Sequence, residues 1–110
     1  MSGIPLLNGT NFSIWKEQLE ICLGVLEMDQ ALRMDKPEKP KDDAADEAKT
    51  AYAKWERSNR ISLMIMKSTI SLAIRGGIPE KNVAGELFTA KEFLTSVEEQ
   101  FKSTSKAVLS

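Results

Sequence analysis

Hydrophobic residues recur at helical spacing near the start of the chain. Between residues 11 and 26, one side of a helical projection carries Phe12, Trp15, Leu19, Cys22, Leu23 and Leu26. Charged residues occupy the other side, which is the pattern of an amphipathic helix. The preceding Asn8-Gly9 dipeptide is typical of a tight turn. The pattern therefore predicts a turn followed by a helix over residues 11–26, with Asn11 or Ser13 as its N-cap.

A second apolar stripe runs along the same predicted helix. It consists of Ile14, Gln18, Ile21 and Val25, at steps of four, three and four. These residues lie roughly opposite Leu19 and Leu23, and a single neighbouring element cannot cover both sides of a helix. Either the helix is sandwiched inside the domain, or this stripe contacts another protein chain. The four residues are therefore the candidate interface.

The next segment changes from apolar to charged. A short helical piece is expected over residues 29–34, followed by the sequence DKPEKPKDD at residues 35–43. Two prolines and a high density of charge exclude a regular element there, so we expect a solvated loop.

The longest predicted element covers residues 44–75, which contain neither glycine nor proline. Steps of three and four trace a buried stripe through Ala48, Tyr52, Trp55, Asn59, Ser62, Met66, Ile70 and Ala73. Acidic residues at the beginning oppose the positive end of the helix dipole. The pattern predicts one long central helix that ends at Gly76-Gly77, followed by an irregular connection with room for a single helical turn.

The last part of the chain returns to helical patterning. Thr89 and Glu92 have the spacing of a capping box, and a one-sided apolar stripe follows. This stripe consists of Ala90, Phe93, Leu94, Val97 and Phe101. We predict a helix over residues 89–103 and the truncated start of a further helix at 105–110.

These elements predict an all-α fold in which residues 1–110 form a single small bundle of four main helices. A chain of 110 residues is long enough to bury a hydrophobic core. With 15 basic and 16 acidic residues the net charge is -1, which argues against a strongly basic nucleic-acid-binding protein. The cationic residues Arg57, Arg60, Lys67 and Arg75 have no aromatic residues interleaved with them, which favours a solvated face over a phosphate-binding strip.

Candidate chemistry is sparse. The chain contains no histidine, which removes the usual general base and histidine-ligated zinc. The acidic cluster at Asp42, Asp43, Asp46 and Glu47 lacks the spacing of a calcium loop. No catalytic residue, cofactor or metal site is expected, and the protein is not expected to be an enzyme.

Two features bear on the compartment. The single cysteine, Cys22, excludes an internal disulfide and fits a reducing compartment. No apolar run is long enough to span a membrane. We therefore expect a cytoplasmic protein without membrane partners.

Three segments together resemble a known family. The stretch LNGTNFSIWKEQLEICLGVLEMDQAL resembles the beginning of the Gag polyprotein of copia-type LTR retrotransposons, in which a Leu-Asn-Gly turn precedes an Asn-aromatic pair and a Trp-Lys. The likeness rests there on Leu7, Asn8, Gly9, Asn11, Phe12, Trp15 and Lys16. It continues in WERSNRISLMIMKSTI and TAKEFLTSVEEQF, in the family's order and at similar separations.

The resemblance implies the helical N-terminal half of a capsid. Its signature core residues would be Phe12, Trp15, Leu19, Trp55, Met66, Ile70, Phe93, Leu94 and Phe101. In this family Gag chains assemble into virus-like particles, so the expected partner is another copy of the chain or a Gag-like chain, in a weak homo-oligomer. The sequence lacks a second capsid half, a zinc knuckle and a basic tail, and direct nucleic-acid binding is therefore not expected. The alternative is a domesticated or truncated Gag-like fragment that binds intact Gag or a host protein as an adaptor or assembly inhibitor.

Overall fold

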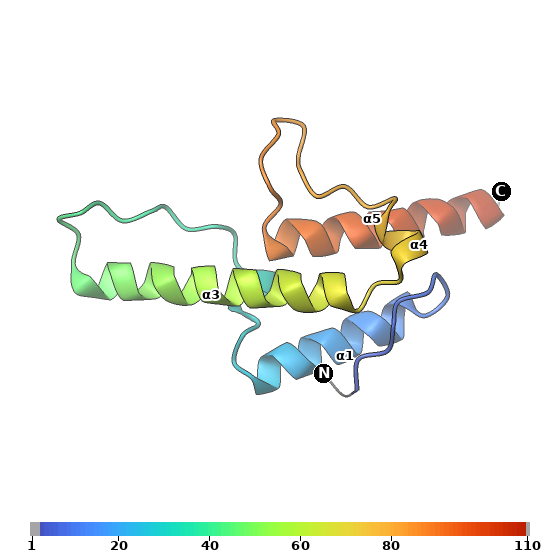
Figure 1. Ribbon diagram of the computed structural model, residues 1–110, viewed down its shortest axis with the longest axis horizontal. Helices are drawn as coiled ribbons and strands as arrows, with labels where there is room; N and C mark the ends of the chain where they lie inside the picture. Colours follow the sequence, from blue (N-terminus) through green and yellow to red (C-terminus); the bar gives the residue numbers. More distant parts are fainter. Residues whose placement is uncertain (1–2, 110) are drawn as a thin grey trace.

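The computed structural model describes the backbone of residues 3–109 and the side chains of residues 3–101. Within this part of the chain it contains five helices (Figure 1). These are α1 (Phe12–Val25), α2 (Gln30–Arg33), α3 (Asp46–Ser68), α4 (Leu72–Arg75) and α5 (Ala90–Leu109). β-Pairing over the described residues is limited to two isolated bridges. The predicted all-α class is therefore confirmed.

The helices form a flat arrangement. The molecule measures 54 × 34 × 21 Å along its principal axes, and the smallest dimension is close to two helix diameters. In Figure 1 α3 runs through the middle, with α1 on one side and α5 on the other. The start of α1 reaches α5, where the Phe12 and Phe101 rings stack with their centroids 5.2 Å apart.

One hydrophobic core joins the helices. Its buried members are Leu7, Trp15, Leu19, Leu23, Ala31, Trp55, Ile65, Met66, Ile70, Ile78, Ala90, Phe93, Leu94 and Val97. Seven of the nine signature residues belong to this buried set. The other two, Phe12 and Phe101, are partly buried and pack against it. The apolar sides of α1, α3 and α5, together with Ala31 of α2, therefore contribute to one core.

The turn before α1 is held by side-chain amides. The Asn8 carboxamide oxygen accepts the Thr10 backbone N–H at 3.1 Å, and Gly9 adopts a φ of 99°. Asn11 occupies the N-cap position of α1, but its side chain makes no capping bond. Instead the Asn11 side chain accepts the Asn8 backbone N–H at 3.0 Å and donates to the Leu6 carbonyl oxygen at 3.0 Å. The predicted N-cap position of Asn11 is therefore confirmed, but its side chain stabilises the turn and does not bond to the N–H groups of α1.

The prediction of one helix over residues 44–75 was also wrong. α3 ends at Ser68, residues 69–71 leave the helical path, and α4 follows as a separate turn. Ala48 and Ala73, assigned to the buried stripe, are both exposed. The remaining members of that stripe lie buried or half-buried, so the error lies at its two ends.

A distant segment interrupts the helix. The Leu7 backbone N–H donates to the Thr69 carbonyl oxygen at 2.7 Å, and the Ser71 N–H donates to the Leu7 carbonyl oxygen at 3.1 Å. These bonds form a parallel bridge between Leu7 and Ile70. Backbone groups that a continued helix would pair internally are thus used by the N-terminal segment. Neither glycine nor proline marks this break, and local sequence therefore does not reveal it.

α5 is longer than predicted, whereas α3 is shorter. α5 continues to Leu109, so the expected boundary between residues 89–103 and a new helix at 105–110 does not exist over the described backbone. Ser110 lies outside the described residues. The capping box at its start is confirmed: the Thr89 N–H donates to the Glu92 carboxylate at 2.9 Å, and the Glu92 N–H donates to the Thr89 hydroxyl at 3.3 Å.

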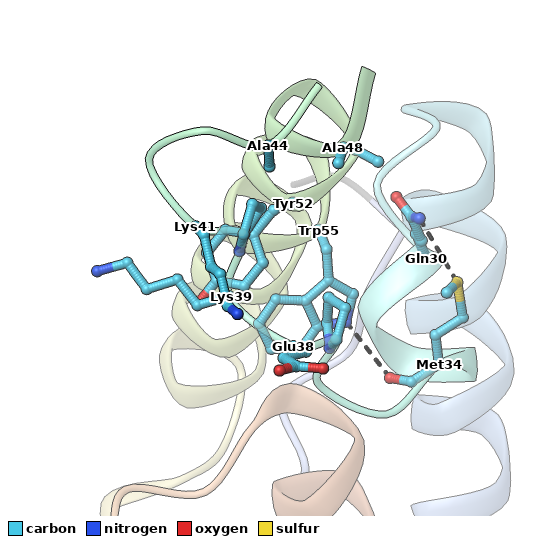
Figure 2. A pocket seen from close by; sticks show the side chains of 12 residues that line it. Gln30, Met34, Glu38, Lys39, Lys41, Ala44, Ala48, Tyr52 and Trp55 are labelled. Carbon is cyan, nitrogen blue, oxygen red and sulfur yellow. Dashed lines mark hydrogen bonds between the residues drawn. The ribbon is translucent and has the colours of Figure 1, made fainter. Parts of the chain in front are cut away.

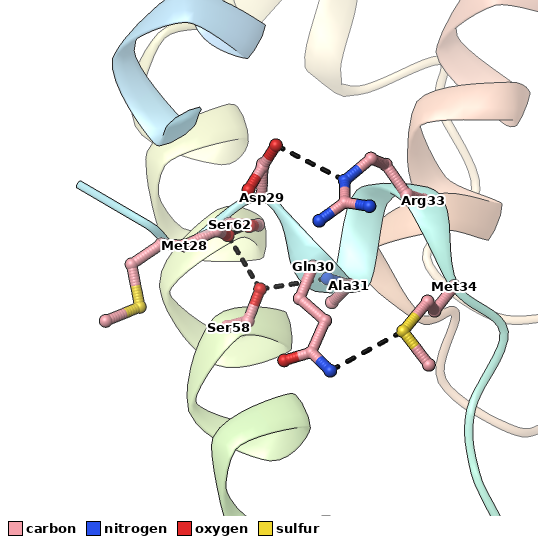
Figure 3. Close-up of polar contacts among 8 residues, drawn as sticks. All are labelled: Met28, Asp29, Gln30, Ala31, Arg33, Met34, Ser58 and Ser62. Carbon is pink, nitrogen blue, oxygen red and sulfur yellow. Dashed lines mark hydrogen bonds and ion pairs between the residues drawn. The ribbon is translucent and has the colours of Figure 1, made fainter. Parts of the chain in front are cut away.

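Two buried serines fasten the connection between α1 and α2 to α3 (Figure 3). The Ser58 hydroxyl donates to the Met28 carbonyl oxygen at 2.6 Å and accepts the Ala31 N–H at 2.9 Å. The Ser62 hydroxyl donates to the same Met28 oxygen at 3.0 Å. Both serines are almost fully buried, and their hydroxyls supply the partners that the connecting backbone needs away from water.

Replacement of Trp15 tests the core. Trp15 is completely buried and its indole N–H donates to the Thr69 hydroxyl at 3.0 Å. Trp15→Ala should lower the free energy of unfolding by about 3–5 kcal/mol, because it leaves a cavity and removes this hydrogen bond. Urea unfolding followed by circular dichroism measures the loss. Leu72→Ala, at a side chain 77% exposed, is the control, and an equal loss in both variants would contradict the core assignment.

The two serines should differ in their effect on stability. Ser58→Ala leaves the buried Ala31 N–H without its partner and should cost about 1–3 kcal/mol of unfolding free energy. Ser62→Ala should cost less, since the Met28 oxygen keeps its bond from Ser58. Thermal and urea unfolding of the two variants measure which one loses more unfolding free energy, with the exposed Ser13→Ala as control. The reverse order would refute the assigned roles.

Candidate functional site

The second apolar stripe of α1 lies on the surface. We call Ile14, Gln18, Ile21 and Val25 the outer stripe. Ile14 is 60% exposed, Ile21 is 52% exposed and Val25 is 78% exposed. The opposite side of α1 is buried through Trp15, Leu19 and Leu23. Within the described part of the chain no helix covers Ile14, Ile21 or Val25, so the structure does not show the sandwiched arrangement.

Gln18 is the one polar and half-buried member of the outer stripe. Its side-chain oxygen lies near the N-terminal segment, 3.8 Å from the point where a Cβ on Gly3 would be. A polar side chain in an otherwise apolar stripe lowers the hydrophobic gain of burial but can orient a contact through hydrogen bonds. The stripe therefore combines three exposed aliphatic side chains with one adaptable amide.

The charged residues of α1 near the outer stripe are solvated or form a partly exposed ion pair. Lys16 pairs with Glu98 of α5 at 3.7 Å, and both side chains are about one-third exposed. Such a partly solvated pair contributes little stability but keeps the charge of Lys16 near α5. Glu17 and Glu20 are exposed on α1. The outer stripe can therefore bury apolar surface against a partner without removing a paired charge from water.

A small apolar cavity lies under the charged loop (Figure 2). It is open to solvent, has a volume of about 410 Å³ between α3 and residues 34–41, and is lined by Trp55, Tyr52, Pro37 and Pro40 among others. The Trp55 indole N–H donates to the Met34 carbonyl oxygen at 3.4 Å, which ties the loop to α3. The predicted loop at residues 35–43 is irregular and mostly exposed, as expected, and only Pro37 and Pro40 are half-buried.

The cationic side chains of α3 and α4 do not form a single strip. Lys67 pairs with Glu80 at 3.1 Å and lies 5.7 Å from the centroid of the Phe93 ring. Arg75 donates to the Lys67 carbonyl oxygen at 3.1 Å. Arg57 and Arg60 are exposed and have no ion pair among the described residues. Two of the four cations are therefore used in local packing.

The described residues form no cluster that could hold a metal ion. Among them no three aspartate, glutamate or cysteine side chains come together as such a site would need. Cys22 is a half-buried free thiol. α4 ends at Arg75, and Gly76 follows with helical dihedral angles, so the helix stops at the predicted place without a left-handed cap. No helix over the described range is long and apolar enough to cross a bilayer.

Sequence reasoning missed one surface feature, between Glu80 and Phe88. This segment contains no helical turn and folds back on itself through an antiparallel bridge between Lys81 and Leu87. We call residues 80–88 the hairpin. The turn residues Asn82 and Gly85 were a signal for it, since asparagine and glycine favour such geometry. It extends away from the helices, as Figure 1 shows.

Charge substitution distinguishes the two sides of α1. Ile21→Asp should change the unfolding free energy by less than about 1 kcal/mol, because its side chain is half exposed. Leu19→Asp, at a fully buried position two residues away, should unfold the domain because it buries an unpaired carboxylate. Circular dichroism and thermal unfolding of the two variants provide the test. Equal destabilisation would mean that the outer stripe belongs to the core.

Comparisons with known proteins gave no further identification. No protein family, no curated protein and no solved structure matched this chain.

Proposed function

We propose that this chain is a non-enzymatic assembly domain that associates with copies of itself, or with a Gag-like chain, through the outer stripe of α1. The exposure of Ile14, Ile21 and Val25 on a helix whose other side is fully buried carries this proposal. Exposed apolar stripes on a helix are typical of protein–protein contacts, because burial against a partner removes that surface from water.

The resemblance to the N-terminal capsid half of copia-type Gag supports the same proposal. The all-α architecture is compatible with it, and the signature tryptophans Trp15 and Trp55 are both buried. On this proposal the domain is a structural component of virus-like particles, acts in the cytoplasm and needs no cofactor. Its contribution to assembly is a contact that is repeated between many chains.

The outer stripe supports only a weak contact. A stable interface buries about 800 Å² on each partner, and four positions of one helix provide much less. Weak contacts suit assembly, since many copies in one particle add their small contributions. We therefore expect dissociation constants of roughly 0.1–1 mM for the isolated domain.

Sedimentation velocity between about 10 µM and 1 mM tests the proposal. The expected result is a concentration-dependent rise in the average sedimentation coefficient. Ile21→Asp should shift the onset of association to at least about tenfold higher concentration, because it places a charge in the contact. Met64→Asp is the matched control, since Met64 is 57% exposed on α3 and outside the outer stripe.

A monomer at every concentration would contradict self-association. If that monomer bound a longer Gag-like chain and lost the binding in Ile21→Asp, the outer stripe would serve the adaptor or inhibitor function instead. Equal effects of Ile21→Asp and Met64→Asp would refute the role of α1.

A further inference from the structure

We propose that α1 pairs with α1 of a second copy of the chain, with the two helices side by side and in the same direction and the two Gln18 amides hydrogen-bonded across the twofold axis. This inference rests on the proposed assembly function and adds to it the direction and the register of the contact. In such a pair each residue of the outer stripe meets its own counterpart. Ile14, Ile21 and Val25 then form three apolar layers, and Gln18 forms a polar layer between them.

The spacing of the outer stripe is that of a coiled-coil seam. Its four residues follow each other at steps of four, three and four, which are the alternating steps of the core positions in a heptad repeat. Ile14 and Ile21 occupy the d positions, whereas Gln18 and Val25 occupy the a positions. α1 is 14 residues long, which is the length of two heptads. The stripe can therefore pack against a second helix with the same spacing.

Gln18 indicates that the partner is a second copy of the chain. Its side chain is half-buried in the apolar stripe and has no hydrogen bond to the described residues. A carboxamide carries both donors and an acceptor, so two of them facing each other bond reciprocally. An apolar partner surface would leave both groups unpaired, which is costly away from water. The amide of an identical chain in register supplies the missing partner.

Gln18 also selects the direction of the pair. In parallel helices a positions face a positions, which brings the two Gln18 amides together. In antiparallel helices a positions face d positions, so Gln18 would lie opposite the partner's Ile21. A single polar residue at an a position is known to fix the register of a helix pair at some cost in stability. The polar layer therefore fits a contact that is specific and weak.

The acidic residues of α1 favour the same direction. Glu17 and Glu20 are exposed on one flank of the outer stripe. Lys16, the one basic residue of α1, is bound to Glu98 of α5. In a parallel pair the acidic flanks of the two helices lie on opposite sides of the seam. In an antiparallel pair they lie on the same side, where like charges repel each other.

Disulfide trapping tests the direction of the pair. Ile14→Cys and Val25→Cys are prepared as separate proteins in a Cys22→Ser background, the second labelled with ¹⁵N. Each is held alone and in an equal mixture at about 0.5 mM, in a glutathione buffer that lets disulfides reshuffle. Mass spectrometry then distinguishes the three possible dimers.

We expect disulfides between like positions, because a parallel pair brings each position within bonding distance of its counterpart. Mixed dimers of Ile14→Cys with Val25→Cys should make up less than about one-tenth of all dimers, against roughly one-half for random pairing. Glu20→Cys, exposed on α1 outside the outer stripe, is the control and should form at least about tenfold less dimer. Mixed dimers at one-half or more, or equal dimer from Glu20→Cys and Ile14→Cys, would overturn the proposal.

Gln18→Glu and Gln18→Lys test the pairing of the amides. Each variant alone should associate at least about tenfold more weakly than the wild type in sedimentation velocity, because two like charges then face each other. An equal mixture of the two should regain association at least as strong as that of the wild type, because a carboxylate then faces an ammonium group. Circular dichroism of each variant checks that the domain stays folded.

The outcomes separate this pairing from the assembly function on which it rests. A wild-type chain that stays monomeric in sedimentation velocity would refute the assembly function and the pairing together. Concentration-dependent association without disulfides between like positions, or without recovery in the mixture of the two Gln18 variants, would refute the pairing alone.

Discussion

Thr69 connects the three parts of the chain on which the fold depends. Its carbonyl oxygen accepts the backbone N–H of Leu7 at 2.7 Å, and its hydroxyl accepts the indole N–H of Trp15 at 3.0 Å. The same hydroxyl donates to the Ile65 carbonyl oxygen at 2.9 Å and so caps the last turn of α3. One residue therefore ends the central helix, anchors the N-terminal segment and holds the largest side chain of α1. These bonds lie largely away from water, where an unpaired polar group is costly, and they select a single arrangement of the three elements.

That arrangement decides which side of α1 faces the solvent. With Trp15 directed at Thr69, Leu19 and Leu23 follow it into the core at helical spacing, and the outer stripe is left on the opposite surface. Ser58 and Ser62 hold the far end of α1 through the Met28 carbonyl oxygen. Contacts near both ends of α1 thus hold it against α3 in the orientation that leaves Ile14 and Val25 exposed. The exposed stripe is a consequence of the same contacts that stabilise the core.

The surface carries two features that the core does not use. The outer stripe is apolar and lies along α1, whereas the cleft between α3 and the hairpin is lined by charged side chains of both signs. Under the proposed function, the outer stripe is the contact that is repeated between identical domains.

The sequence by itself determined the helical class, the positions of α1 and α2 to within about one residue, the capping box of α5 and most of the core. These features follow from periodicity and local capping, which act over a few residues. It also identified the outer stripe but left open whether that stripe is covered. The break after Ser68, the continuation of α5 to Leu109 and the hairpin cleft were decided only by the tertiary structure. The physical reason is that these features depend on partners distant in sequence: Leu7 competes for the backbone at Thr69 and Ser71, and Glu80 at the start of the hairpin pairs with Lys67 of α3 at 3.1 Å. A local sequence pattern does not indicate which distant residues will contact it.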